Sequence, residues 1–180
     1  MSNVPQPPPL LAYETFVRVL RVARSDGLSI VVISGSLALF FAYKGEVGGA
    51  LLGLLVAGAG AMELHGVGLL RHGYTTGVDW LVRGQLFLLA VMSSYCAFRL
   101  MHVDLEPIRT LFHEMLRLPG MQAEWRAAQE QSGVTEDEYL RLLYSINYVV
   151  IAAASLLYQG GMTLYYTRRR AAVLAALAVD

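Results

Sequence analysis

The chain has 180 residues, of which 56% are hydrophobic and only 16% charged, and its formal net charge is zero. This balance gives no support for a nucleic-acid partner, and the single cysteine, Cys96, cannot form an intrachain disulfide. Nucleotide-binding loops, nucleophile elbows and paired-cysteine motifs do not occur, which argues against a hydrolase or a nucleotide-dependent enzyme.

The charges are unevenly distributed along the chain. Residues 27–43 and 147–167 contain no charged side chain, and residues 47–70 contain only Glu63. A helix that crosses a bilayer needs roughly 20 apolar residues. The distribution therefore predicts an integral membrane protein whose immediate surroundings are the lipid bilayer.

The N-terminal part is predicted to lie outside the membrane. Residues 1–9 are rich in proline and predict a disordered segment. Residues 10–24 have apolar positions on one helical face and three arginines on another, which is typical of a helix in the membrane interface. An extension of the first spanning helix is an equal alternative. Ser25, Asp26 and Gly27 interrupt the pattern and offer a helix N-cap.

Four membrane-spanning helices are predicted, at about residues 27–43, 47–70, 80–101 and 142–167. The second contains a small residue at every fourth position, and such a ridge lets another helix approach closely within the chain or between copies. The predicted packing face consists of Gly49, Gly53, Ala57 and Ala61.

Residues 102–137 form the one long hydrophilic segment and are predicted to be a helical loop outside the membrane. Apolar spacing indicates one helix from Leu105 to Leu118 and a second over 121–131, closed by Gly133. Thr135 and Glu138 then form a capping-box pattern at the start of a long helix. Arg168 to Arg170 are expected to end that helix, leaving a short surface helix in the tail.

These elements predict an all-α fold: a polytopic bundle of about four transmembrane helices with an interfacial N-terminal helix and a helical extramembrane loop. The side that holds both termini and the loop at 71–79 collects eight basic residues, against six on the other side. Basic residues favour the cytoplasmic side. We therefore expect a multi-pass protein of the cell membrane with cytoplasmic termini.

Glu63 is the most informative polar residue, because an ionisable group inside a span is costly and faces a partner or a water-filled cavity. An antiparallel hairpin brings Arg83 to a similar depth, which predicts a Glu63–Arg83 ion pair. That pair is either a proton, ion or ligand site or a structural contact that fixes helix register, and the second interpretation is favoured. Gln85 and a polar stripe on the fourth span, with Tyr148 and Tyr158, could line the same cavity; hydrogen bonding between helices is the favoured alternative.

His65 and His72 lie seven residues apart on one helix, where two histidines could ligate haem or a metal. A bis-histidine site needs a second helix, so no cofactor and no metal are predicted.

The leading functional hypothesis is a non-enzymatic scaffold or subunit that associates with copies of itself or with a membrane complex through its small-residue faces. The first alternative is a small channel or transporter with a Glu63/Arg83 site. The second is a membrane redox or lipid-modifying enzyme that uses His65 and His72.

Overall fold

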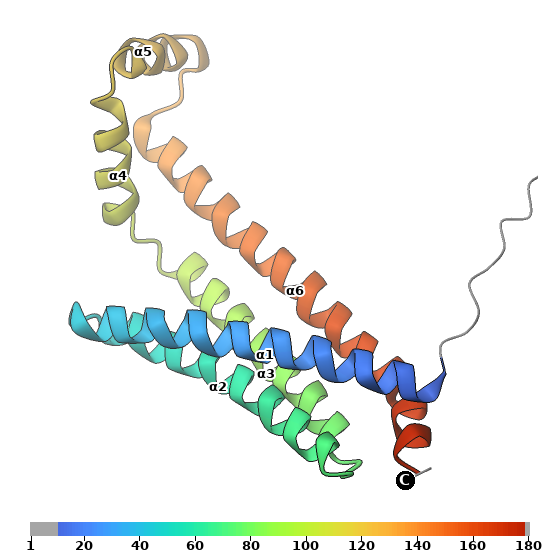
Figure 1. The fold of residues 1–180 in the computed structure, drawn as a ribbon. Coiled ribbons are helices and arrows are strands. Elements are labelled where there is room, and N and C mark those ends of the chain that lie inside the picture. Colours follow the sequence, from blue (N-terminus) through green and yellow to red (C-terminus); the bar gives the residue numbers. More distant parts are fainter. Residues whose placement is uncertain (1–10, 179–180) are drawn as a thin grey trace, which may run out of the picture. The chain divides into compact units, whose positions relative to one another are not determined.

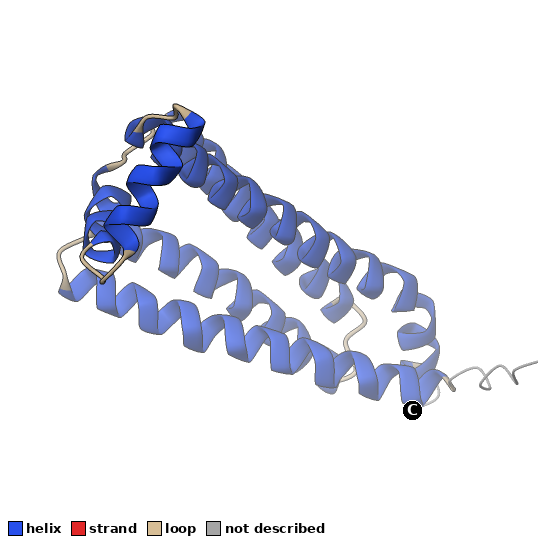
Figure 2. Cartoon of the chain, turned by 90° about the horizontal axis from the view of Figure 1, so that it is seen from above, coloured by secondary structure: helices blue, strands red, loops and turns tan. Residues whose placement is uncertain are grey.

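The computed structural model describes residues 11–178, so the segment predicted to be disordered, 1–9, lies outside the described residues. Within that range the secondary structure is entirely helical, with short loops between the helices (Figures 1 and 2). The helices are α1 (Ala12–Tyr43), α2 (Val47–Arg71), α3 (Gly77–Met101), α4 (Glu106–Leu116), α5 (Met121–Ser132) and α6 (Glu136–Leu177).

Four of these helices, α1, α2, α3 and α6, are long and apolar enough to cross a membrane. Their most apolar windows have mean hydropathies of 1.4 to 1.7, and only 17% to 28% of each window is buried. The predicted spans fall inside these helices. Few residues of these apolar segments are buried within the chain, which is compatible with helices that span a membrane.

The chain divides into two compact units. The first contains α1, α2, α3 as far as Val91, and α6 from Leu156 onward; the second runs from Met92 to Ser155.

In the first unit, α1 is a single helix of 32 residues rather than an interfacial helix followed by a span. The break expected at Ser25, Asp26 and Gly27 does not occur, and the extension of the first span is the arrangement found. Asp26 does not cap a helix because its carboxylate accepts hydrogen bonds from Gln85 and Tyr158. Gly27 is buried against α2, so this glycine marks a helix contact and not a helix end.

A short turn brings α2 back antiparallel to α1, and glycines set the distance between the two helices (Figure 1). A Cβ on Gly53 would lie 2.8 Å from the Cβ of Ala38, and one on Gly60 would lie 2.8 Å from the carbonyl oxygen of Gly27. Such distances leave no room for a methyl group. The helices therefore touch through their backbones, as small residues allow.

Only the first half of the predicted ridge of small residues on α2 lies in the contact with α1. Gly49 and Gly53 face α1, whereas Ala57 is half-buried and Ala61 is exposed. Four residues turn a helix by about 400°, so a strict four-residue repeat rotates away from a straight neighbour by about 40° per step. The contact continues instead at Gly60, seven residues after Gly53, as in a left-handed coiled coil.

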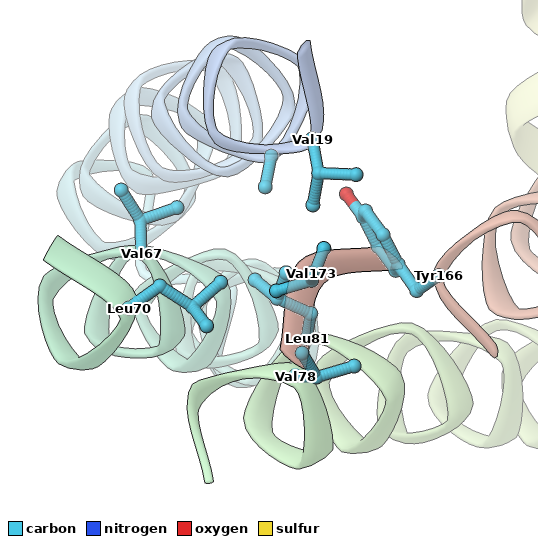
Figure 3. Close-up of a cluster of buried hydrophobic side chains, with 8 residues drawn as sticks. Val19, Val67, Leu70, Val78, Leu81, Tyr166 and Val173 are labelled. Carbon is cyan, nitrogen blue, oxygen red and sulfur yellow. The ribbon is translucent and has the colours of Figure 1, made fainter. Parts of the chain in front are cut away.

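α3 also approaches α2 through glycines, on a face that adjoins the α1 contact at Glu63. The Cβ position of Gly66 is 2.8 Å from the carbonyl oxygen of Gly77, and that of Gly84 is 3.0 Å from Cγ of Glu63. The core of the unit fills the space beside these contacts with aliphatic side chains and one tyrosine (Figure 3). Its buried members are Val19, Ala23, Val67, Leu70, Val78, Leu81, Tyr166 and Val173.

α6 does not end at its three arginines, and the expected separate tail helix is not found. The helix continues to Leu177, and Val173 joins the core of the first unit. Arg170 forms an ion pair with Asp79 of α3, with Nη1 2.7 Å from Oδ1. The basic cluster therefore lies within α6 and contributes a contact with α3, and it does not end the helix.

The second unit contains α4, α5 and the start of α6, and its helix ends follow the sequence signals. The Thr135 backbone N–H donates to Glu138 Oε2 at 2.9 Å, and the Glu138 N–H donates to Thr135 Oγ1 at 3.3 Å. This confirms the predicted capping box. Gly133 ends α5 in the left-handed conformation, with φ of 68°. Trp125 of α5 packs edge-on against buried Phe112 of α4, with ring centroids 5.1 Å apart.

Two glycines of α2 provide a test of this packing. We expect Gly60→Ala to lower the free energy of unfolding in detergent by about 2 kcal/mol, because the methyl group would displace a backbone oxygen. Gly58→Ala should leave it unchanged or raise it by up to about 1 kcal/mol, since no described atom lies within 4 Å of that position and alanine favours helix. Equal effects of the two substitutions would contradict the packing.

Candidate functional site

Two carboxylates from different helices meet at one amide group in the first unit. Gln85 Nε2 donates to Asp26 Oδ2 at 2.8 Å and also donates to Glu63 Oε1. The Tyr158 hydroxyl donates to Asp26 Oδ1 at 2.6 Å. Together these four side chains, one from each of α1, α2, α3 and α6, form what we call the acid pair site.

Glycines create the space for Glu63. A Cβ on Gly27 of α1 would lie 3.1 Å from Cβ of Glu63, and a Cβ on Gly84 of α3 would lie 3.0 Å from its Cγ. The glutamate stem thus passes between two backbones that carry no side chain at its level. A Cβ at either position would require the neighbouring atoms of α2 to move by a few tenths of an ångström.

The site is closed around Glu63 and more open around Asp26. Glu63 is 1% exposed and Gln85 is fully buried, whereas Asp26 is half-buried and Tyr158 is exposed. Among residues 11–178, no hydrogen-bond partner is found for Glu63 Oε2 or for Gln85 Oε1. Buried polar atoms without partners are uncommon in proteins and often mark functional positions.

The ion pair predicted between Glu63 and Arg83 is not formed. Arg83 is exposed, and none of the ion pairs in the described part of the chain includes it. Successive helical residues are about 100° apart, so Arg83 and Gln85 point in directions about 200° apart. Gln85 lies on the buried face of α3 with Leu81 and Leu88, and Arg83 lies on the other side.

The electrostatic consequence is that two acids are close together, and within residues 11–178 no basic side chain is bonded to either. Desolvating one carboxylate is costly, and two like charges that share a site cannot easily both remain ionised. The amide of Gln85 offsets part of this cost by donating one hydrogen to each acid. A bound proton or cation would offset the rest.

The other predicted site residues lie elsewhere. His65 packs edge-on against Trp80, with ring centroids 4.8 Å apart, and His72 Nδ1 is 2.8 Å from the Gly68 carbonyl oxygen of its own helix. The two imidazole rings thus contact different neighbours and do not form a common site. In residues 11–178 no group of three histidine, cysteine or acidic side chains is placed to hold a metal ion.

The tyrosines of α6 do not act as one stripe. Tyr158 belongs to the acid pair site in the first unit, whereas Tyr148 belongs to the second unit. There its hydroxyl accepts a hydrogen bond from Arg99 Nε at 3.0 Å, and the guanidinium lies 5.6 Å from the centres of the Tyr144 and Tyr148 rings. These two tyrosines bind the arginine through hydrogen bonding and cation–π attraction.

Asp26 is the functional candidate that sequence analysis missed, because a charged residue beside glycine reads as a helix start. A signal was present in the neighbouring residues. Small or apolar residues recur at every fourth position up to and past Asp26, at Val19, Ala23 and Gly27, which is the spacing of one uninterrupted helical face. All three are buried in the structure.

No protein-family model, no curated protein and no solved structure matches this chain.

Two buried glutamines allow a matched test of the acid pair site. We expect Gln85→Leu to reduce the free energy of unfolding in detergent by about 3 kcal/mol, because both acids would lose the hydrogen bond from the shared amide. Gln159→Leu makes the same chemical change at a buried position whose carbonyl oxygen has no partner in residues 11–178. That variant should be neutral or slightly stabilised. Similar losses in the two variants would show that the shared amide has no special role.

Proposed function

We propose that this protein is a multi-pass protein of the cell membrane, in the class of small channels and transporters, and that its acid pair site binds a proton during transport. The supporting observation is that Asp26 and Glu63 share one buried amide donor, and that no basic side chain of the described residues is bonded to either acid. Ionisable groups within spans are expensive and commonly belong to proton or ion pathways.

A proton suits the site better than a metal cation. The two N–H bonds of Gln85 point at the two carboxylates, so the partly positive amide hydrogens occupy the position that a bridging cation would take. A proton needs only one carboxylate oxygen, and Glu63 Oε2 is available for it. Protonation removes one of the two like charges without disturbing the shared amide.

The scaffold hypothesis has less support. The small-residue face was predicted to pack within the chain or between copies, and its half at Gly49 and Gly53 packs within the chain against α1. A redox or lipid-modifying enzyme has less support as well, because His65 and His72 bind separate neighbours. We retain the proposed orientation with cytoplasmic termini, which rests on the excess of arginines on that side.

Proton flux into liposomes tests the proposal. Vesicles that contain the full chain and a trapped pH-sensitive dye should equilibrate an imposed pH gradient faster than empty vesicles when valinomycin and potassium balance the charge. We expect Glu63→Gln to reduce this rate to that of empty vesicles, because the amide can no longer take up a proton. Glu46→Gln is the matched control, since Glu46 is exposed in the turn between α1 and α2.

If vesicles with the wild-type chain equilibrate the pH gradient no faster than empty vesicles, the proposal of proton transport is wrong. If Glu63→Gln and the wild type equilibrate it at equal rates, the acid pair site is not the proton-binding site. Infrared spectroscopy supplies a readout that does not depend on flux. The wild type should show the carbonyl stretch of a protonated carboxyl group at neutral pH, and Glu63→Gln should lack it. Circular dichroism and gel filtration in detergent establish that the variants are folded.

A further inference from the structure

A basic hollow lies beside the first half of α1, next to the end of α2. Its volume is about 500 Å³, which is within the range of small-molecule sites. Its lining combines three arginines and a serine with three aliphatic side chains: Arg21, Arg24, Arg71, Ser25, Val17, Leu20 and Leu28.

The arginines converge because the two helices are antiparallel in a fixed register. Gly27 of α1 contacts Leu64 of α2, and Arg71 lies seven residues beyond Leu64, about 10 Å further along the helix. Because α1 runs in the opposite direction, Arg21, which precedes Gly27 by six residues, lies at about the same level as Arg71. Arg24 follows Arg21 by three residues and therefore lies on the same side of α1.

The positive charges of these arginines are not neutralised by ion pairs within the described part of the chain. Arg21, Arg24 and Arg71 are exposed, and none of them takes part in an ion pair within residues 11–178. Arg18 lines an adjoining hollow together with Arg21 and Glu14, so the carboxylate there offsets one positive charge and the two hollows together keep an excess of arginines. Guanidinium groups bind phosphate oxygens through paired hydrogen bonds, so the hollow is suited to a phosphate group.

An apolar surface leads away from the arginines along α1. Leu28 is 51% exposed and Val32 is 56% exposed, and both lie on one face of the helix with Leu39. Gly35 lies on this face as well, and no described atom stands within 4 Å of its Cβ position. The face is a shallow apolar track that begins at the basic hollow and runs into the segment suited to a membrane.

We propose that the basic hollow binds the headgroup of an anionic phospholipid, with an acyl chain lying along the track of Leu28, Val32 and Leu39. The phosphodiester sits among Arg21, Arg24 and Arg71. A free phosphate ion would use the arginines but would leave the apolar lining and track unused. Basic pockets at helix ends near the membrane surface bind such headgroups.

The experiment uses the purified full chain in a neutral detergent and measures phospholipid binding by native mass spectrometry. Dioleoyl phosphatidylglycerol is titrated in parallel with dioleoyl phosphatidylcholine, which has no net charge. We expect the first to bind more tightly. The combined variant Arg21→Gln, Arg24→Gln, Arg71→Gln should bind phosphatidylglycerol about 100-fold more weakly, since each basic residue contributes on the order of 1 kcal/mol to such binding.

The matched control removes three other exposed arginines that form no ion pair in the described part of the chain, Arg117, Arg126 and Arg141. This control should retain wild-type affinity. Equal affinity of wild type and the hollow variant, or equal weakening in the hollow variant and the control, would overturn the proposal.

Competition with inorganic phosphate distinguishes a site for a phospholipid headgroup from a site for free phosphate. If phosphate at a concentration equal to that of the lipid displaces phosphatidylglycerol, the hollow is a phosphate site and the lipid assignment is wrong. The single variant Arg71→Gln, at the exposed end of α2, should weaken binding by itself, and it keeps the test valid if the combined variant proves unstable.

Discussion

The hydrogen bonds from one buried amide, that of Gln85, to two carboxylates are the interaction on which the first unit depends. Each of the two acids comes from a different helix, and Tyr158 brings a fourth helix to the same group. In a low-dielectric setting an acid without a donor is strongly unfavourable. The helices that contribute these groups are thus held in one register, since a small slide would leave a carboxylate unpaired.

Glycine makes this arrangement possible. Between α1 and α2, and again between α2 and α3, backbone atoms meet where side chains would normally keep helices apart. In a bilayer, where lipid provides no hydrophobic drive between helices, such close backbone contacts and polar bonds would be what holds them together. Gly27 and Gly84 serve both needs, because they bring the helices close and they leave space for the stem of Glu63.

The sequence predicts the parts of this fold that depend on local chemistry. Apolar runs locate the four long helices, and the Thr135 capping box and Gly133 locate helix ends, because these signals act over a few residues. Failures occurred where tertiary contacts override local signals. Asp26 resembles a helix start until its partners on other helices are known. The predicted Glu63–Arg83 pair rests on depth alone, and rotation about the axis of α3 places Arg83 on the exposed side of the helix.

The unequal exposure of the two acids has a consequence for directionality. Asp26 borders the surface beside an exposed tyrosine, whereas Glu63 is enclosed by the backbones of α1 and α3. Under the proposed proton transport, a proton would enter at the Asp26 edge and could not pass beyond Glu63 in this arrangement of the helices. Release toward the far side would need a second conformation, so the conformation described here would be open to one side only.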